Sequence, residues 1–124
     1  MELRECYERL GGDFDAVLAH LRTEARVEKF LLLFLEDDSH DRLVRCLEND
    51  DDDGAFRAVH TLKGICQNLS FTRLFQSSSV LTEALRNGRS GDISGLVRAV
   101  EADYAQTAAA IQLLKQERTG GQPS

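Results

Sequence analysis

Residues 53–69 have the sequence DGAFRAVHTLKGICQNL, and its apolar positions recur with the period of a helix. A helix turns about 100° per residue, so positions can be placed on a wheel centred on His60. One continuous apolar stripe then falls within roughly 80° of the opposite pole. It consists of Ala55, Ala58, Val59, Leu62, Ile65, Cys66 and Leu69. The stretch therefore predicts an amphipathic helix that buries this stripe and turns His60 to solvent.

The face centred on His60 is mostly polar. Within roughly 60° of His60 the wheel places Phe56, Arg57, Lys63, Gly64 and Gln67. A glycine inside a helix lowers the stability of that helix by about 1 kcal/mol relative to alanine. We therefore infer that residue 64 is glycine because open space is needed beside the imidazole. An exposed imidazole next to a cation suits a phosphoryl group that arrives from one partner and leaves to another. On the simpler interpretation, His60 and Lys63 are ordinary solvated side chains.

The rest of the chain also predicts helices. Its 124 residues contain few Val and Ile, many Ala, Leu, Glu and Arg, and one proline, Pro123. Asp13 and Thr23 are expected as N-caps, and Gly11-Gly12 as a helix stop. The expected helices span residues 2–10, 13–21, 23–36, 39–48 and 53–69, then Ser70 or Phe71 to Arg86, and Ser90 or Asp92 to Glu117. This order predicts an all-α fold, an antiparallel four-helix bundle with additional short N-terminal helices. Residues 1–118 would form the domain and residues 119–124 a disordered tail.

The longest apolar run, Phe30 to Leu35, is too wide for one core stripe. Either the N-terminal helices cover it, or part of it forms an apolar docking patch beside the His60 helix. The two interpretations are compatible if the N-terminal helices cover only some of the run.

Composition excludes several classes of function. The net charge of −6 argues against a nucleic-acid binder. Three cysteines without CxxC spacing, Cys6, Cys46 and Cys66, predict free thiols, with no metal site and no cofactor. No signal peptide is recognised, and the Phe30–Leu35 run is far too short to span a membrane. We therefore expect a cytoplasmic protein.

The run His60-Thr61-Leu62-Lys63-Gly64, followed by Gln67-Asn68-Leu69, resembles the signature of histidine-containing phosphotransfer (HPt) domains. The resemblance extends over roughly residues 10–115 and includes the order of the helices. One position departs from the pattern, because the family often has glycine where this chain has Ser70. We expect Ser70 to act as an N-cap for the following helix, which changes the turn and leaves the site intact.

The resemblance implies a phosphoryl carrier of a two-component phosphorelay, with His60 as the phosphoryl acceptor. Its partners would be response-regulator receiver domains or a hybrid sensor kinase, which supply the aspartate and Mg²⁺. Lys63 would neutralise phosphoryl oxygens, Gly64 would leave room for the partner, and Gln67 would hydrogen-bond the imidazole or the phosphoryl group. The chain shows no nucleotide-binding loop and is expected to be a monomer without kinase activity of its own.

Phe56 and Arg57 are expected to contact the partner, because they share the face of His60. For Phe56 the alternative is that the N-terminal helices or the Phe30–Leu35 helix fold over it. Two other functions stay open for the chain. One is a helical adaptor that binds a receiver domain or kinase without transferring phosphate. The other is an enzyme that uses His60 as a general base, for which the sequence shows no second catalytic group.

Overall fold

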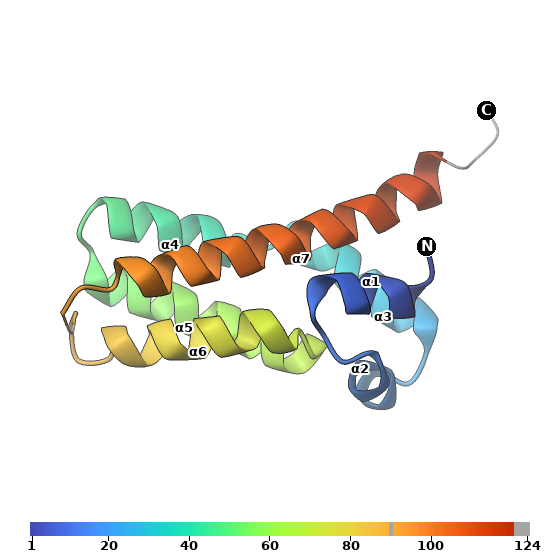
Figure 1. Ribbon diagram of the computed structural model, residues 1–124, viewed down its shortest axis with the longest axis horizontal. Helices are drawn as coiled ribbons and strands as arrows, with labels where there is room; N and C mark the ends of the chain where they lie inside the picture. The colour runs from blue at the N-terminus through green and yellow to red at the C-terminus, as the bar shows by residue number, and fades with distance from the viewer. Residues whose placement is uncertain (90, 121–124) are drawn as a thin grey trace.

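The computed structural model describes residues 1–89 and 91–120, and within these ranges the chain forms seven helices and no strand (Figure 1). They are α1 (Leu3–Leu10), α2 (Phe14–Leu21), α3 (Glu24–Phe34), α4 (Ser39–Glu48), α5 (Asp52–Leu69), α6 (Thr72–Leu85) and α7 (Ser94–Gly120). Helices α4 to α7 run alternately up and down along the long axis of the molecule. Helices α1 to α3 gather at one end, where α1 packs against the C-terminal half of α7. The predicted all-α bundle with extra N-terminal helices is confirmed.

Helix α5 lies in the bundle with its apolar stripe inward, packed between α4 and α6. Six of the seven stripe residues are buried, namely Ala55, Ala58, Val59, Leu62, Cys66 and Leu69. The seventh, Ile65, is only half-buried at the edge of the stripe. Burying a side chain the size of Leu62 stabilises a fold by about 2 kcal/mol, so this stripe determines how α5 is rotated. His60, at the opposite pole, is exposed.

The predicted caps at the N-terminal helices are present. The Asp13 carboxylate accepts a hydrogen bond from the backbone N–H of Ala16 at 3.0 Å, and the Thr23 hydroxyl accepts one from Arg26 at 3.2 Å. Gly11 ends α1 in the left-handed conformation, with φ 79°. Each cap satisfies a backbone group that the helix leaves without a partner.

Several predicted boundaries need correction. Ser70 is not an N-cap, because it ends α5 in the left-handed conformation with φ 58°, and Phe71 precedes α6 without a side-chain cap. Helix α3 ends at Phe34, two residues before the predicted end. Helix α7 begins at Ser94 and continues to Gly120, past the predicted domain boundary at 118. Ser90 and the remainder of the predicted tail, residues 121–124, lie outside the described residues.

The turn between α5 and α6 is hydrogen-bonded to the N-terminal segment. The Tyr7 hydroxyl donates to the carbonyl of Leu69 at 2.8 Å, and the N–H of Asp13 donates to the carbonyl of Ser70 at 2.9 Å. A Cβ at Gly12 would lie 2.7 Å from the same Ser70 carbonyl oxygen, so this close approach requires glycine. The last carbonyls of α5 gain partners in this way. The contact also places α2 and α3 beside the C-terminal half of α5.

Replacing Ser70 by glycine should stabilise the protein. An L-residue with φ 58° is strained, whereas glycine adopts this conformation freely. After allowance for the greater freedom of glycine in the unfolded chain, we expect Ser70→Gly to raise the free energy of unfolding by about 0.5–1 kcal/mol in urea titrations. Gly11→Ala is the converse control and should lower it, because φ is 79° there and the new Cβ would lie 3.0 Å from Arg73 Cβ. A loss of stability in Ser70→Gly would show that the serine side chain is needed at this turn.

Candidate functional site

His60 lies at the middle of α5 with its imidazole exposed. In residues 1–89 and 91–120, neither ring nitrogen forms a hydrogen bond, and the neighbouring ring is that of Phe56, one turn earlier. The two ring centroids are 5.8 Å apart and the planes are tilted by 31°. The imidazole is therefore accessible to a partner and is not held by the fold through a hydrogen bond.

Gly64, one turn after His60, borders open space. A Cβ built on it would meet no atom within 4 Å, apart from the backbone of its own helix. Gly54 in the same helix differs, since its Cβ would lie 2.7 Å from Cys46 Sγ and 2.4 Å from the Asp51 carboxylate. Packing therefore explains the glycine at 54 but not the one at 64. Gln67, a further turn along, is exposed and does not contact His60 through any hydrogen bond in the described part of the chain.

The cations around His60 face carboxylates. Arg57, on one side of His60, forms an ion pair with Asp53 four residues earlier. On the other side, α6 contributes Glu83, whose carboxylate accepts a hydrogen bond from Arg86 Nε at 2.7 Å. That hydrogen bond, with the charge of Arg86 and a smaller contribution from Lys63, holds the pKa of the Glu83 carboxyl below its ordinary value. Glu83 is thus close enough to both Lys63 and Arg86 for their charges to lower the pKa of its carboxyl.

Phe56 is half-buried, and the end of α6 covers part of it. The Arg86 guanidinium carbon lies 5.2 Å from the centroid of its ring, within the range of a cation–π contact. Contact from α6 was not among the sequence expectations, which considered a partner, the N-terminal helices or the Phe30–Leu35 helix as the cover. The remaining surface of the ring is free to contact another molecule.

A family model described as Hpt domain matches residues 30–117, which include α4 to α6, most of α7 and therefore His60. The chain belongs to the Hpt domain family. Comparisons with curated proteins and with solved structures gave no match. The match to the Hpt family model confirms the resemblance noted in the sequence. Hpt domains take part in two-component phosphorelays as phosphocarriers. The helices α1 and α2 of this Hpt domain lie outside the matched range.

An apolar groove runs beside the C-terminal half of α5. It has a volume of about 410 Å³ and lies between α2, α3 and α5. Its walls include Leu21, Phe30, Leu33 and Ile65, with His20 and Asn68 among the polar residues. Leu33 is 46% exposed, whereas Leu31 and Phe34 of the same run are buried. Part of the Phe30–Leu35 run is therefore core, and part lines a groove next to the His60 helix.

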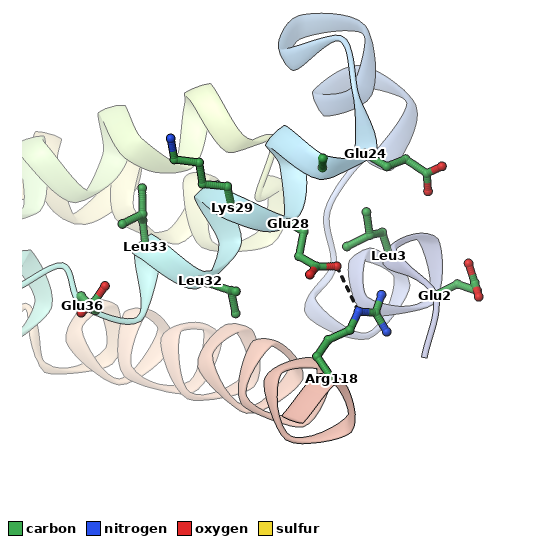
Figure 2. Close-up of a pocket in the computed structure, with 10 residues that line it drawn as sticks. Glu2, Leu3, Glu24, Glu28, Lys29, Leu32, Leu33, Glu36 and Arg118 are labelled. Atoms are coloured by element: carbon green, nitrogen blue, oxygen red, sulfur yellow. Dashed lines mark hydrogen bonds and ion pairs between the residues drawn. The ribbon is translucent and has the colours of Figure 1, made fainter. Parts of the chain in front are cut away.

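A second hollow of the Hpt domain lies between α1, α3 and α7 (Figure 2). Its volume is about 700 Å³ and four glutamates border it, namely Glu2, Glu24, Glu28 and Glu36. The Arg118 guanidinium points toward Glu28, as Figure 2 shows, and donates to its carboxylate at 3.0 Å. None of the residues that line this hollow belongs to α5. It meets the apolar groove at Leu33, which lines both, but it does not reach α5.

Three other nucleophilic side chains, His40, Cys6 and Cys66, have structural environments. His40 is stacked on Tyr104 at 3.7 Å and shares a 2.8 Å hydrogen bond with Glu101. Cys6 and Cys66 are buried, and burial raises the pKa of the Cys6 thiol to about 11 and that of Cys66 further. Protonated buried thiols are poor nucleophiles. His60 therefore has the most accessible environment of these groups.

Two substitutions test the open space at Gly64. Gly64→Ala should raise the free energy of unfolding by about 0.5–1 kcal/mol, since alanine is the better helix former and its Cβ meets nothing. Gly54→Ala, in the same helix, should lower it, because the new Cβ collides with the Asp51 cap and with Cys46. Urea unfolding of both variants measures the difference.

Gly64→Leu should also keep the helical circular dichroism and the cooperative unfolding transition of the wild-type protein. An unfolded Gly64→Leu variant would show that residue 64 is a packing position.

Proposed function

We propose that this Hpt domain carries a phosphoryl group on His60 between aspartates of receiver domains. The observation that supports this most directly is the exposed imidazole beside open space at Gly64, in a chain of the Hpt family. Packing gives no reason for a glycine at position 64, on the face of α5 that carries His60. The carrier role needs a nucleophile that a partner can reach from outside, and α5 presents one.

The chemistry proceeds by direct transfer. A neutral imidazole nitrogen of His60 forms a bond to the phosphorus of a phospho-aspartate. The P–O bond of the acyl phosphate breaks, and the aspartate carboxylate leaves with the bonding electron pair. The reverse reaction with a second receiver returns the imidazole and phosphorylates that aspartate. The receiver supplies the aspartate and Mg²⁺, so this chain acts as a carrier and not as a kinase.

Neighbouring side chains adjust the charge at the phosphoryl group. Lys63 contributes a positive charge one turn from His60, on the side that faces Glu83. Gln67, exposed on the same face, donates to the imidazole or to a phosphoryl oxygen. Lys63 and Gln67 can take these roles from the surface of α5 without displacing any core side chain.

The receiver docks on the surface around His60. The apolar groove of Leu21, Phe30, Leu33 and Ile65 receives an apolar face of the partner, and the exposed part of Phe56 extends the contact in the other direction. Arg57 lies at the rim of this surface. Apolar side chains surrounded by polar ones are typical of interfaces between soluble proteins.

We further propose that the protein acts as a cytoplasmic monomer, with receiver domains or a hybrid sensor kinase as partners and without nucleic acid. In the described part of the chain, no helix combines the length and hydropathy needed to cross a membrane. A helical adaptor that binds receivers without transfer is the second candidate. An adaptor would use the same docking groove but would not require a reactive imidazole. Phosphorylation of His60 therefore distinguishes a carrier from an adaptor.

His60→Gln should abolish phosphorylation. Incubation with phosphorylated receiver domains should label the wild-type protein with an acid-labile, base-stable phosphate, because phosphorus bonded to nitrogen is cleaved in acid. The variant should stay unlabelled and keep its helical circular dichroism, since position 60 is exposed. Label that persists in His60→Gln would refute His60 as the acceptor. Receiver binding without any label in the wild type would favour the adaptor.

Leu33→Asp should weaken receiver binding at least fivefold, with little change in melting temperature. The reason is that Leu33 is 46% exposed and lines the groove, so an aspartate there disturbs the partner more than the core. Ala109→Asp is the matched control, because it adds the same charge to an exposed site of α7, across the bundle from α5. Titration calorimetry with a receiver domain measures both. Equal affinities for the two variants would place the docking surface elsewhere.

A further inference from the structure

The hollow between α1, α3 and α7, which we call the acidic hollow, has an apolar floor. The floor consists of Leu3, Leu32 and Leu33. The leucine of α1 is buried, whereas the two leucines of α3 are half-buried and exposed in turn. In Figure 2 the leucines lie between Glu36 at one end and Glu2 and Glu24 at the other. The acidic hollow therefore has an apolar middle and acidic ends.

Most of the carboxylates at the acidic hollow have no counter-charge. Of its four glutamates, Glu28 is ion-paired, with Arg118 at 3.0 Å. The other three are exposed and form no ion pair within residues 1–89 and 91–120. Lys29 also borders the hollow, and in Figure 2 its side chain points away from Glu28. The two ends of the hollow thus carry negative charge that the described part of the chain does not neutralise.

The stability of α3 does not explain this set of charges. The helix dipole favours Glu24 at the start of α3 but disfavours Glu36, which follows its C-terminal end. Glu24 and Glu28 are also four residues apart on one face of α3, where like charges destabilise a helix. A partner that brings positive charge would make these carboxylates favourable.

Much of the acidic hollow lies outside the part of the chain that the family model matches. The match begins at residue 30, whereas Glu2, Leu3, Glu24 and Glu28 precede it. The hollow is therefore built largely by this chain's own N-terminal segment. At Leu33 it adjoins the apolar groove, so one partner can contact both surfaces.

We propose that the acidic hollow binds a basic amphipathic helix of a partner protein. Its apolar side chains would pack on Leu32 and Leu33, and Lys or Arg near its two ends would pair with Glu24 and Glu36. Charge complementarity selects this occupant, because the hollow is apolar in the middle and acidic at both ends. The two glutamates are 12 positions apart, about 18 Å along a helix, which is the length of roughly three turns. The hollow uses no residue of α5, so the inference does not depend on the role of His60.

Peptide titration tests the acidic hollow directly. The probe is an amphipathic peptide of about twelve residues, with leucines on one face and lysines at both ends. In ¹⁵N-labelled protein at low salt, it should shift the amide signals of Glu28, Leu32 and Leu33 and leave that of His60 unmoved. The same peptide with glutamate in place of lysine should shift none of them. A lysine peptide with serine in place of leucine should bind about tenfold more weakly, because it buries no apolar side chain on the floor.

Substitutions at Ala25 test the contribution of charge. Ala25 is exposed on α3 and lines the acidic hollow. Ala25→Lys should weaken binding of the lysine peptide about fivefold, the size of one unit-charge contact at about 4 Å in water, and Ala25→Glu should strengthen it. Ala102→Lys is the matched control, because it adds the same charge to an exposed site of α7 that does not line the hollow. It should bind the lysine peptide as the wild-type protein does.

The outcomes decide for or against a basic partner at this site. Amide shifts spread over acidic surfaces away from the hollow, or equal affinities of Ala25→Lys and Ala102→Lys, would overturn the proposal. Equal binding of the serine peptide would also overturn it, since the apolar floor would then have no role. Shifts of the same signals on concentrating the protein without peptide would show that a second copy of this chain is the occupant instead.

His60→Gln should bind the lysine peptide as tightly as the wild-type protein. Loss of binding in that variant would place the peptide on α5 and would overturn the proposal. A chain that binds the peptide but is never labelled at His60 would contradict the proposed function alone.

Discussion

The burial of one side of α5 is the constraint on which the rest of the structure depends. Val59, Leu62 and Cys66 have no exposed surface, and they lie between α4 and α6. Rotating α5 by half a turn would expose these side chains and bury a histidine and a lysine, at a cost of several kcal/mol. Core packing alone therefore keeps His60 at the surface. An exposed imidazole on a fixed helix needs no loop to position it.

The connection between the N-terminal segment and the end of α5 decides what surrounds that helix. Tyr7 and Asp13 donate to the carbonyls of Leu69 and Ser70, which a helix end leaves without partners. The same contacts bring α2 and α3 against α5, so that Leu33 and Ile65 become walls of one groove. The hydrogen bonds that satisfy the end of α5 therefore also form the groove that we propose for receiver docking.

Local charge at the site differs from the charge of the whole molecule. The chain carries a net charge of −6, yet Arg57 and Lys63 lie on α5 within one turn of His60, and Arg86 lies over the neighbouring Phe56 ring. Asp53 and Glu83 balance these cations through exposed ion pairs, which are weak and easily exchanged. Such pairing keeps the resting surface nearly neutral.

The sequence by itself determined the helices and the outward face of α5, since both follow from interactions between residues at most four positions apart. The period of the apolar stripe turned His60 to solvent, and the caps at Asp13 and Thr23 could be recognised by residue type. Only the tertiary structure decided that Arg86 covers Phe56 and that Ser70 ends α5 in the left-handed conformation. These features depend on how separate helices are placed and on which carbonyls the N-terminal segment reaches. No local pattern encodes them, because the partners meet only after the helices pack.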